Sequence, residues 1–254
     1  MYPFQPYFGL GVYAMLKKMI CFSLAVLVAV VGHTAPMLWS DAVQTMSFSP
    51  IPYTLIIDAG HGGEDGGAVS ITGVSESQIN LSMALKLEDI LALYGLAPKM
   101  LRREDISLHD DHAATIREKK VSDLHNRVSM IEETANPFLI SIHQNTYTES
   151  RYHGAQVFYA PTPGSQDIAR KTQQDLSKNL DPTNLREAKQ IPDTVYLMNH
   201  ITCPAILIEC GFLTNQEEEA LLRQDRYQRK LAASLAGTLL NVSEPLNILQ
   251  ETSL

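Results

Sequence analysis

Two histidines and two glutamates stand where strands end or a helix begins. His61 lies in "DAGHGGEDGG" after the apolar run "LII", His143 ends "FLISIH", and Glu209 ends "AILIE". Glu76 lies in the first turn of the helix expected after the glycine-rich loop. Two imidazoles and one carboxylate are a common catalytic zinc set that leaves a position for water. A further carboxylate can accept that water's proton, so the four residues together predict a hydrolytic metal site.

Each of these residues alone has a plainer explanation. A histidine at a strand end often only hydrogen-bonds a loop, and Glu76 could simply favour the helix dipole, which is worth about 0.3–1 kcal/mol. Glu209 is harder to explain in this way, because a carboxylate directly after four apolar strand residues is costly unless it is paired or bound. Asp58 could orient His61 or cap the tight turn. The convergence of the four residues, rather than any one of them, carries the prediction.

The elements that must position these side chains alternate between strand and helix. Ser75 with Gln78 predicts a capping box at the start of the first helix, and Gly95 is expected to close it. A long loop is expected over 104–122. The expected strands span 53–58, 97–103, 137–143, 154–160 and 204–209, and the expected helices span 76–94, 123–135, a segment carrying Ile168, Thr172 and Leu176, and 227–240. The pattern predicts an α/β fold: a single domain with a mostly parallel twisted sheet and helices on both faces.

In such sheets, ligands bind beyond the carboxyl ends of the strands. His61, His143 and Glu209 each follow a different strand, and Glu76 opens the helix after the first of them. The topology therefore delivers all four side chains to one edge, where the glycines would let a metal and a substrate approach the backbone.

The N-terminus has the pattern of an export signal. Lys17 and Lys18 precede an uncharged run of 14 residues, Met19–Gly32. This run is short for a membrane span of about 20 residues and fits a signal peptide better, and the lysines favour a cytoplasmic N-terminal side. Only Ala35 suggests a cleavage site, so cleavage and uncleaved anchoring both stay open. The expected organisation is a signal peptide or N-terminal membrane anchor over 1–35, a linker over 36–50, a catalytic domain over 51–243 and a C-terminal tail over 244–254.

Composition excludes several classes of function. The net charge is −8 and no basic block is present, which argues against nucleic-acid binding. The glycine loop lacks the Lys-Ser/Thr of a phosphate-binding loop. Cys203 and Cys210 bracket an expected strand of about 23 Å, too long for a disulfide, and Cys210 is expected to be a small buried hydrophobe.

Several stretches together resemble the zinc-dependent N-acetylmuramoyl-L-alanine amidases of bacterial cell walls. They run from about Tyr53 to about Leu240 and include "IIDAGHGGEDGGA", "GVSESQINLSMALKL", "LRRED", "DLHNRV", "FLISIHQN", "GAQVFY" and "PAILIECGFLTNQEEEALL". By this resemblance, His61, Glu76 and His143 match the ligands of one Zn²⁺ per chain, and Glu209 matches the catalytic glutamate. The resemblance implies hydrolysis of the amide between N-acetylmuramic acid and L-alanine in peptidoglycan, which releases stem peptides.

The resemblance also suggests substrate contacts. Asn145, Arg103 and Arg127 are candidates to contact glycan or peptide, although a role at a helix surface or in anchoring a loop is favoured for Arg127. Ala59 stands where the family often has proline. Gln144 stands where a small residue is common, and it could alter the substrate groove.

The short form without wall-binding repeats, together with "TIREKKVSDLHNR", is similar to the spore-cortex, germination-specific amidases. Those enzymes act in sporulation, before muramic δ-lactam forms. The resemblance implies export to the cell wall or spore intermembrane space, with membrane contact only through the N-terminal segment, and no feature identifies a protein partner. Two alternatives remain: another zinc peptidase that cuts within the stem peptide, and a non-catalytic wall-binding regulator.

Overall fold

The computed structural model describes residues 53–241, together with Met15, Met19, Ser23 and Leu24. Apart from those four residues, the predicted export segment lies outside the described residues, as do the linker and the C-terminal tail. The chain divides into two units, Met1–Ser49 and Pro50–Leu254, and the fold below is that of the second unit. Among the described residues, no helix is both long and apolar enough to span a membrane.

A six-stranded sheet forms the centre of the fold, with strand order β2-β1-β3-β6-β4-β5. Its three central strands β1, β3 and β6 are parallel neighbours and are almost wholly buried. The strands are β1 Thr54–Ala59, β2 Lys99–Met100, β3 Pro137–Asn145, β4 Gln156–Tyr159, β5 Lys189–Gln190 and β6 Ala205–Phe212. Strands buried on both faces read as continuous apolar runs, which explains "TLII", "FLISI" and "AILI".

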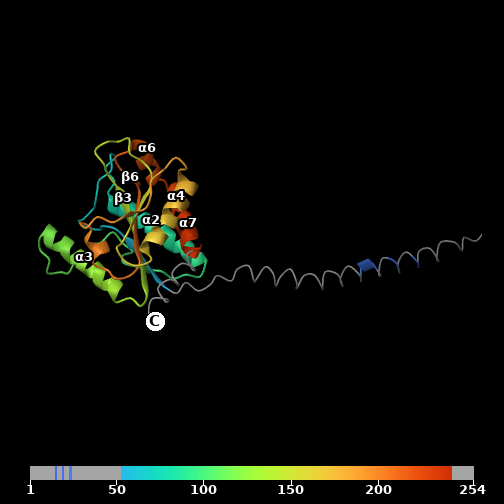
Figure 1. Ribbon diagram of the computed structural model, residues 1–254, viewed down its shortest axis with the longest axis horizontal. Coiled ribbons are helices and arrows are strands. Elements are labelled where there is room, and N and C mark those ends of the chain that lie inside the picture. The colour runs from blue at the N-terminus through green and yellow to red at the C-terminus, as the bar shows by residue number, and fades with distance from the viewer. Residues whose placement is uncertain (1–14, 16–18, 20–22, 25–52, 242–254) are drawn as a thin grey trace, which may run out of the picture. The chain divides into compact units, whose positions relative to one another are not determined.

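Helices cover both faces of this sheet, as predicted. One core cluster joins the sheet to α2, α4 and α7, and a second joins its opposite face to α3 and α5. In Figure 1, α3 lies on the side of the sheet away from α2, α4 and α7. The helices are α2 Glu76–Leu93, α3 Ile116–Glu132, α4 Ser165–Leu180, α5 Tyr196–Asn199, α6 Gln216–Leu222 and α7 Asp225–Asn241. The predicted single α/β domain with a mostly parallel sheet is confirmed.

Helix α3 begins earlier than predicted. The segment 104–122 was expected to be a loop, but α3 starts at Ile116. Thr115 accepts a hydrogen bond from the Glu118 backbone N–H, and the Glu118 side chain accepts one from the Thr115 N–H, so "TIRE" is a complete capping box. This box was the local signal for the true start of the helix.

The start of α2 is held differently from the prediction. Ser75 is the N-cap residue, but its side chain makes no capping hydrogen bond, so the predicted capping box with Gln78 is wrong. The backbone N–H groups of Glu76 and Ser77, which lie in the first turn of the helix, instead donate to the carbonyls of Ala68 and Gly66. Gly95 does close the helix, with a φ of 78° that glycine adopts readily.

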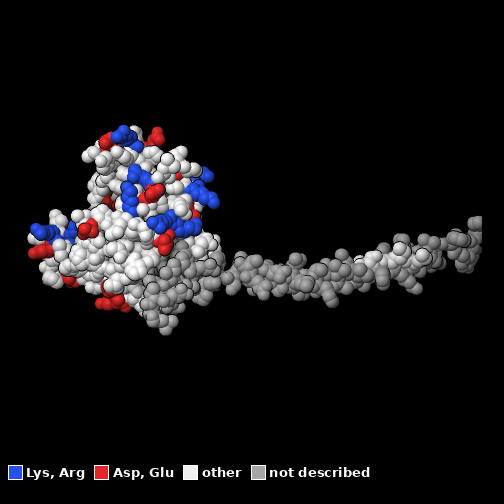
Figure 2. All heavy atoms as spheres, viewed as in Figure 1, with Lys and Arg blue, Asp and Glu red and all other residues white. Residues whose placement is uncertain are grey.

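The strands toward both edges of the sheet and two short helices were predicted less completely. Strand β4 runs antiparallel to β6, the expected strand 97–103 pairs only over Lys99–Met100, and β5, α5 and α6 were not expected. Cys203 and Cys210 form no disulfide and Cys210 is buried, as predicted, and Cys203 is buried as well. Basic and acidic side chains lie next to one another on the face in Figure 2, and exposed pairs include Lys171 with Asp175 and Arg229 with Asp225.

Candidate active site

The carboxyl ends of β1, β3 and β6 meet at one edge of the sheet. His143 of β3 stands in register with Glu209 of β6, and the Gly60 N–H donates to Ile142 O at 3.0 Å. His61 follows Gly60 directly. Because the three strands are parallel and adjacent, residues 61, 143 and 209 are placed side by side, as the sequence predicted.

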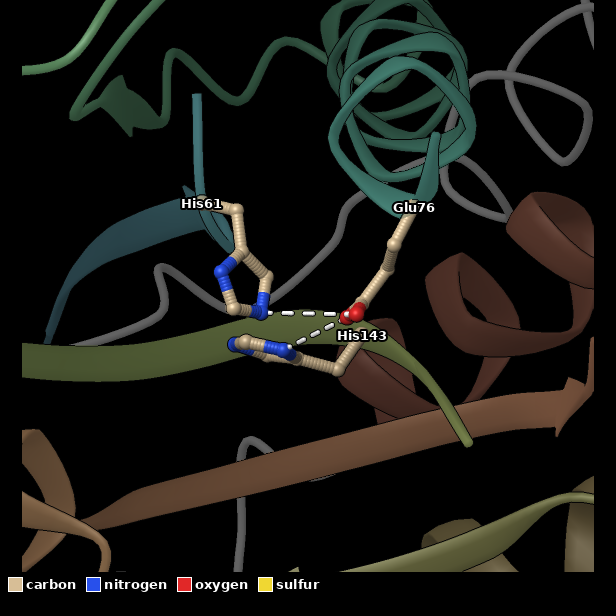
Figure 3. Close-up of side chains that lie close together, drawn as sticks. All are labelled: His61, Glu76 and His143. Carbon is tan, nitrogen blue, oxygen red and sulfur yellow. Dashed lines mark hydrogen bonds and ion pairs between the residues drawn. The ribbon is translucent and has the colours of Figure 1, made fainter. Parts of the chain in front are cut away.

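Glu76 enters the same space from the first turn of α2. Its Oε1 lies 2.9 Å from His143 Nδ1, and its Oε2 lies 3.4 Å from His61 Nε2. The imidazole centroids are 5.1 Å apart, and Figure 3 shows the three side chains converging. One potential ligand atom from each residue lies within 4.8 Å of the other two. This spacing can hold a metal ion.

The loop that carries His61 is fixed by two buried arginines. His61 has a φ of 62°, a left-handed conformation that is uncommon for a residue with a side chain. Arg127 of α3 donates to His61 O at 2.8 Å, and Arg102 donates to Gly60 O at 3.1 Å. Arg127 therefore anchors the loop that carries His61, which agrees with the anchoring role expected for it. Strain of this kind persists where surrounding contacts over-determine the backbone.

Asp58 does not orient His61. Its carboxylate pairs with Arg127 and accepts a hydrogen bond from Ser141 at 2.7 Å, and only 1% of the residue is exposed. Burial acts to raise the pKa of Asp58, but the Arg127 and His143 charges together with the hydrogen bonds from Ser141 and Arg127 outweigh it, and the pKa is lowered overall. Both roles suggested for Asp58 from the sequence are wrong, because the carboxylate faces α3.

Asp65 holds His61 instead, a role the sequence reasoning missed. Its Oδ2 lies 3.0 Å from His61 Nδ1, and Lys120 approaches the same oxygen at 3.3 Å. The hydrogen bond with His61 is the main cause of a lowered pKa for Asp65. A carboxylate on the distal imidazole nitrogen fixes the ring orientation and leaves Nε2 free as a ligand. The spacing of four residues between His61 and Asp65 was the signal in the sequence that could have indicated this contact.

Two glycines leave room for the convergent side chains. A Cβ on Gly60 would lie 2.1 Å from the His143 ring, and one on Gly67 would lie 2.6 Å from both Glu76 Oε2 and His61 Cδ2. Gly67 also has a φ of 67°. The glycines of this loop thus permit the three proposed ligands themselves to pack together.

Glu76 is held as an anion in spite of its burial. Its Oε1 also accepts from the Gln144 backbone N–H at 3.1 Å, and its Oε2 accepts from the Ala68 N–H at 2.9 Å. Burial acts to raise the pKa of Glu76, but the His143 hydrogen bond and the histidine charges lower it to about 2. Burial likewise acts to lower the pKa of the His143 imidazole. The hydrogen bond and the charge of Glu76 act in the opposite direction, and the pKa of His143 lies above its usual value.

Glu209 has the opposite environment. Its Oε2 is buried and, among the described residues, has no hydrogen-bond partner. Burial raises the pKa of Glu209 to about 7, with His143 and His61 acting to lower it and Glu76 to raise it. The carboxyl groups of Glu76 and Glu209 therefore have widely separated pKa values. Such a separation is typical of a site in which one carboxyl group stays an anion and the other exchanges protons.

A cavity of about 200 Å³ opens beside the cluster. Its wall includes His61 and His143 together with Thr194, Val195 and Tyr196. This hollow adjoins the reactive edge of the sheet, so it can receive the group that reacts there.

The three other residues singled out from the sequence lie outside this wall. Asn145 is half-buried at the end of β3, two residues beyond His143. Arg103 is exposed and pairs with Glu88 of α2. Gln144 is 4% exposed and faces Asn80 and Met83 of α2, so the expectation that it alters a substrate groove is wrong.

The chain also matches a known family over its folded domain. Residues 55–241 match the family model of N-acetylmuramoyl-L-alanine amidases. The chain therefore belongs to this family of peptidoglycan-cleaving enzymes, as the resemblance predicted. Because peptidoglycan lies outside the cytoplasmic membrane, this activity implies an exported protein.

Individual relatives agree. The chain is 36% identical over 182 residues to the germination-specific N-acetylmuramoyl-L-alanine amidase of Bacillus subtilis, covering 71% of this chain and 76% of the relative. The fold matches the CwlD amidase of Clostridioides difficile, solved in complex with the GerS lipoprotein, with a TM-score of 0.71 and 36% identity over 74% of this chain and 97% of that one. A second C. difficile amidase has a TM-score of 0.64 and 26% identity over 80% and 100% of the two chains.

Proposed function

We propose that the protein is a zinc-dependent amidase that hydrolyses the bond between N-acetylmuramic acid and L-alanine, with His61, Glu76 and His143 as ligands of one zinc ion. The convergence of their three potential ligand atoms within 4.8 Å carries this proposal. Zinc in proteins favours imidazole nitrogen and carboxylate oxygen, and three protein ligands are usual where it is catalytic. When bound there, zinc would supply Lewis-acid activation of water and of a carbonyl group.

Glu209 is the proposed general base and acid. Its buried Oε2 has no partner in the described part of the chain, so this oxygen is free to accept a proton from the attacking water. A carboxyl group whose pKa is about 7 both takes and returns protons near neutral pH. Glu209 would therefore pass the proton on to the leaving nitrogen of L-alanine. Asn145 and Arg103 remain proposed contacts for glycan or peptide.

We extend the proposal to spore-cortex maturation, where removal of stem peptides precedes muramic δ-lactam formation. The germination-specific name of the Bacillus subtilis relative supports this role. The CwlD neighbour was solved with a lipoprotein, which supports the proposal that this amidase also takes a protein partner. Residues 1–35 are the proposed signal peptide or membrane anchor.

The proposal is tested by digesting purified peptidoglycan with the full chain and identifying the products by mass spectrometry. Release of intact stem peptides, loss of release after chelation and recovery on adding zinc are expected. Shortened stem peptides would identify a peptidase. Binding without any cleavage, in protein that contains zinc, would identify a wall-binding regulator.

A further inference from the structure

Two buried amides lie behind the proposed ligand Glu76. Asn80 is fully buried one helical turn after Glu76, and Gln144 follows His143 on β3. Gln144 Nε2 donates to Asn80 Oδ1 at 3.1 Å. Asn80 Nδ2 in turn donates to Glu76 Oε1 at 3.2 Å and to Gly60 O at 3.1 Å. The chain of contacts thus runs from β3 through α2 to the carboxylate and to the loop before His61.

Contacts on both sides fix which way the Asn80 amide faces: Oδ1 accepts from Gln144, and Nδ2 donates to Glu76 and Gly60. An asparagine amide can rotate by half a turn and exchange its oxygen and nitrogen with little change of shape. With Gln144 donating to it, Oδ1 must face β3, and Nδ2 must face Glu76 and Gly60. The opposite orientation would place Oδ1 against two acceptor oxygens and leave buried donors and acceptors unpaired, which is costly.

A ligating carboxylate must be held in one orientation for tight metal binding. Amide N–H groups donate whatever the protonation state of the neighbouring histidines, so the Asn80 contact persists when a histidine gives up its proton to act as a ligand. The Gln144 backbone N–H donates to the same Oε1 at 3.1 Å. Neither amide side chain lines the cavity beside the histidines.

We infer that Asn80 and Gln144 are a positioning pair that fixes the Glu76 carboxylate and thereby sets the affinity of the site for zinc. The inference rests on the proposed function, because it assumes that Glu76 is a ligand. Gln144 is a positioning residue that acts through Asn80, and its side chain lies outside the wall of the cavity beside the histidines. One of its own atoms, Oε1, is buried without a partner in the described part of the chain, so stability alone does not explain an amide at this position.

The test measures the zinc dissociation constant of the full chain by competition with a chromogenic chelator. Gln144→Met keeps the length of the side chain and its contact with Met83 but removes the amide that donates to Asn80 Oδ1. We expect it to weaken zinc binding about tenfold, the lower end of the 10–100-fold range typical for partners of metal ligands. Asn80→Asp, which places oxygen where nitrogen stood, should weaken binding further. The absorption spectrum of the cobalt-substituted protein should shift in both variants.

Gln228→Met is the matched control. Gln228 is 5% exposed against 4% for Gln144, and it also contacts α2, where its Oε1 accepts from the Ser82 hydroxyl at 2.7 Å. It touches no proposed ligand. This variant should lower the melting temperature of the metal-free protein but leave zinc affinity within twofold of the parent.

Each outcome decides the inference. Unchanged zinc affinity in Gln144→Met, or equal weakening in Gln228→Met, would overturn the positioning role while leaving the proposed function intact. If Gln144→Met does not fold, Gln144→Ala replaces it, and the Asn80→Asp result is read against the same control. A parent protein that binds no zinc would overturn the proposed metal site and this inference together.

Discussion

Replacing Arg127 with methionine should destabilise the domain by about 3–5 kcal/mol at neutral pH, because it removes the cation of a buried ion pair and leaves the carboxylate behind. The guanidinium pairs with Asp58 and Asp123, and Asp58 would remain 1% exposed without its counter-ion. A loss of this size is a large part of the 5–15 kcal/mol typical of domains. The exposed pair of Arg229 with Asp225 supplies the control, since Arg229→Met should cost about 0–1 kcal/mol.

The pH dependence of this loss has a definite sign. In the parent, the pKa of Asp58 is lowered, so its contribution to stability is present above the unfolded pKa and is lost as pH falls through the folded one. In Arg127→Met, only the His143 charge and the Ser141 hydrogen bond still oppose burial, so the folded pKa of Asp58 rises. As pH falls, Asp58 of the variant takes up a proton, and the cost of its buried charge disappears. The stability gap between parent and variant should therefore narrow from pH 7 to pH 5.

Urea unfolding at both pH values measures the gap, with unchanged m-values confirming that the same transition is compared. Arg127→Met/Asp58→Asn should recover part of the loss, because it removes the uncompensated charge. A loss below about 1 kcal/mol, or a gap that widens on acidification, would refute the reasoning about the buried pair.

Three further predictions address the site and the export segment. Gly67→Ala should weaken zinc binding, since the added Cβ would lie 2.6 Å from Glu76 Oε2. Gly73→Ala is the control, because Gly73 also has a positive φ but has open space around it, so this variant should lose only stability. Equal loss of zinc in both variants would contradict the prediction. Elemental analysis of His143→Ala should show zinc far below the parent content, and full occupancy would remove His143 from the ligand set. The chain without residues 1–35 should stay soluble with a parent-like melting temperature, and aggregation under conditions where the full chain is stable would place the apolar run in the fold.

The convergence of the candidate site residues was predictable because parallel topology makes the ends of adjacent strands neighbours. Three apolar runs each ended in a reactive side chain, and β1, β3 and β6 are in fact adjacent and parallel. The supporting acids were not predictable in the same way. Asp58 and Asp65 stand three and four residues from His61, and only the left-handed turn at His61 decides that Asp65 meets the ring while Asp58 faces Arg127.

The start of α3 was missed for a related reason. Its buried positions are Asp123, Arg127 and Ile131, of which two are charged, so no apolar period marks the helix. The direction of β4 was also open, because a short apolar run does not state whether its neighbour is parallel. In both places, contacts between distant segments decide the local structure.

Glu209→Gln tests the central claim most directly, with zinc content, melting temperature and stem-peptide release measured on one preparation. The substitution keeps shape but removes the basic oxygen, so zinc should stay near one ion per chain while release falls by about 10²–10⁴-fold. Glu218→Gln is the control for loss of a structural acid. Glu218 is 7% exposed and accepts from the backbone N–H groups of Gly154 and Phe212, so this variant should lose thermal stability rather than catalysis. Near-normal peptide release by Glu209→Gln would contradict the account, and loss of zinc would move Glu209 into the ligand set.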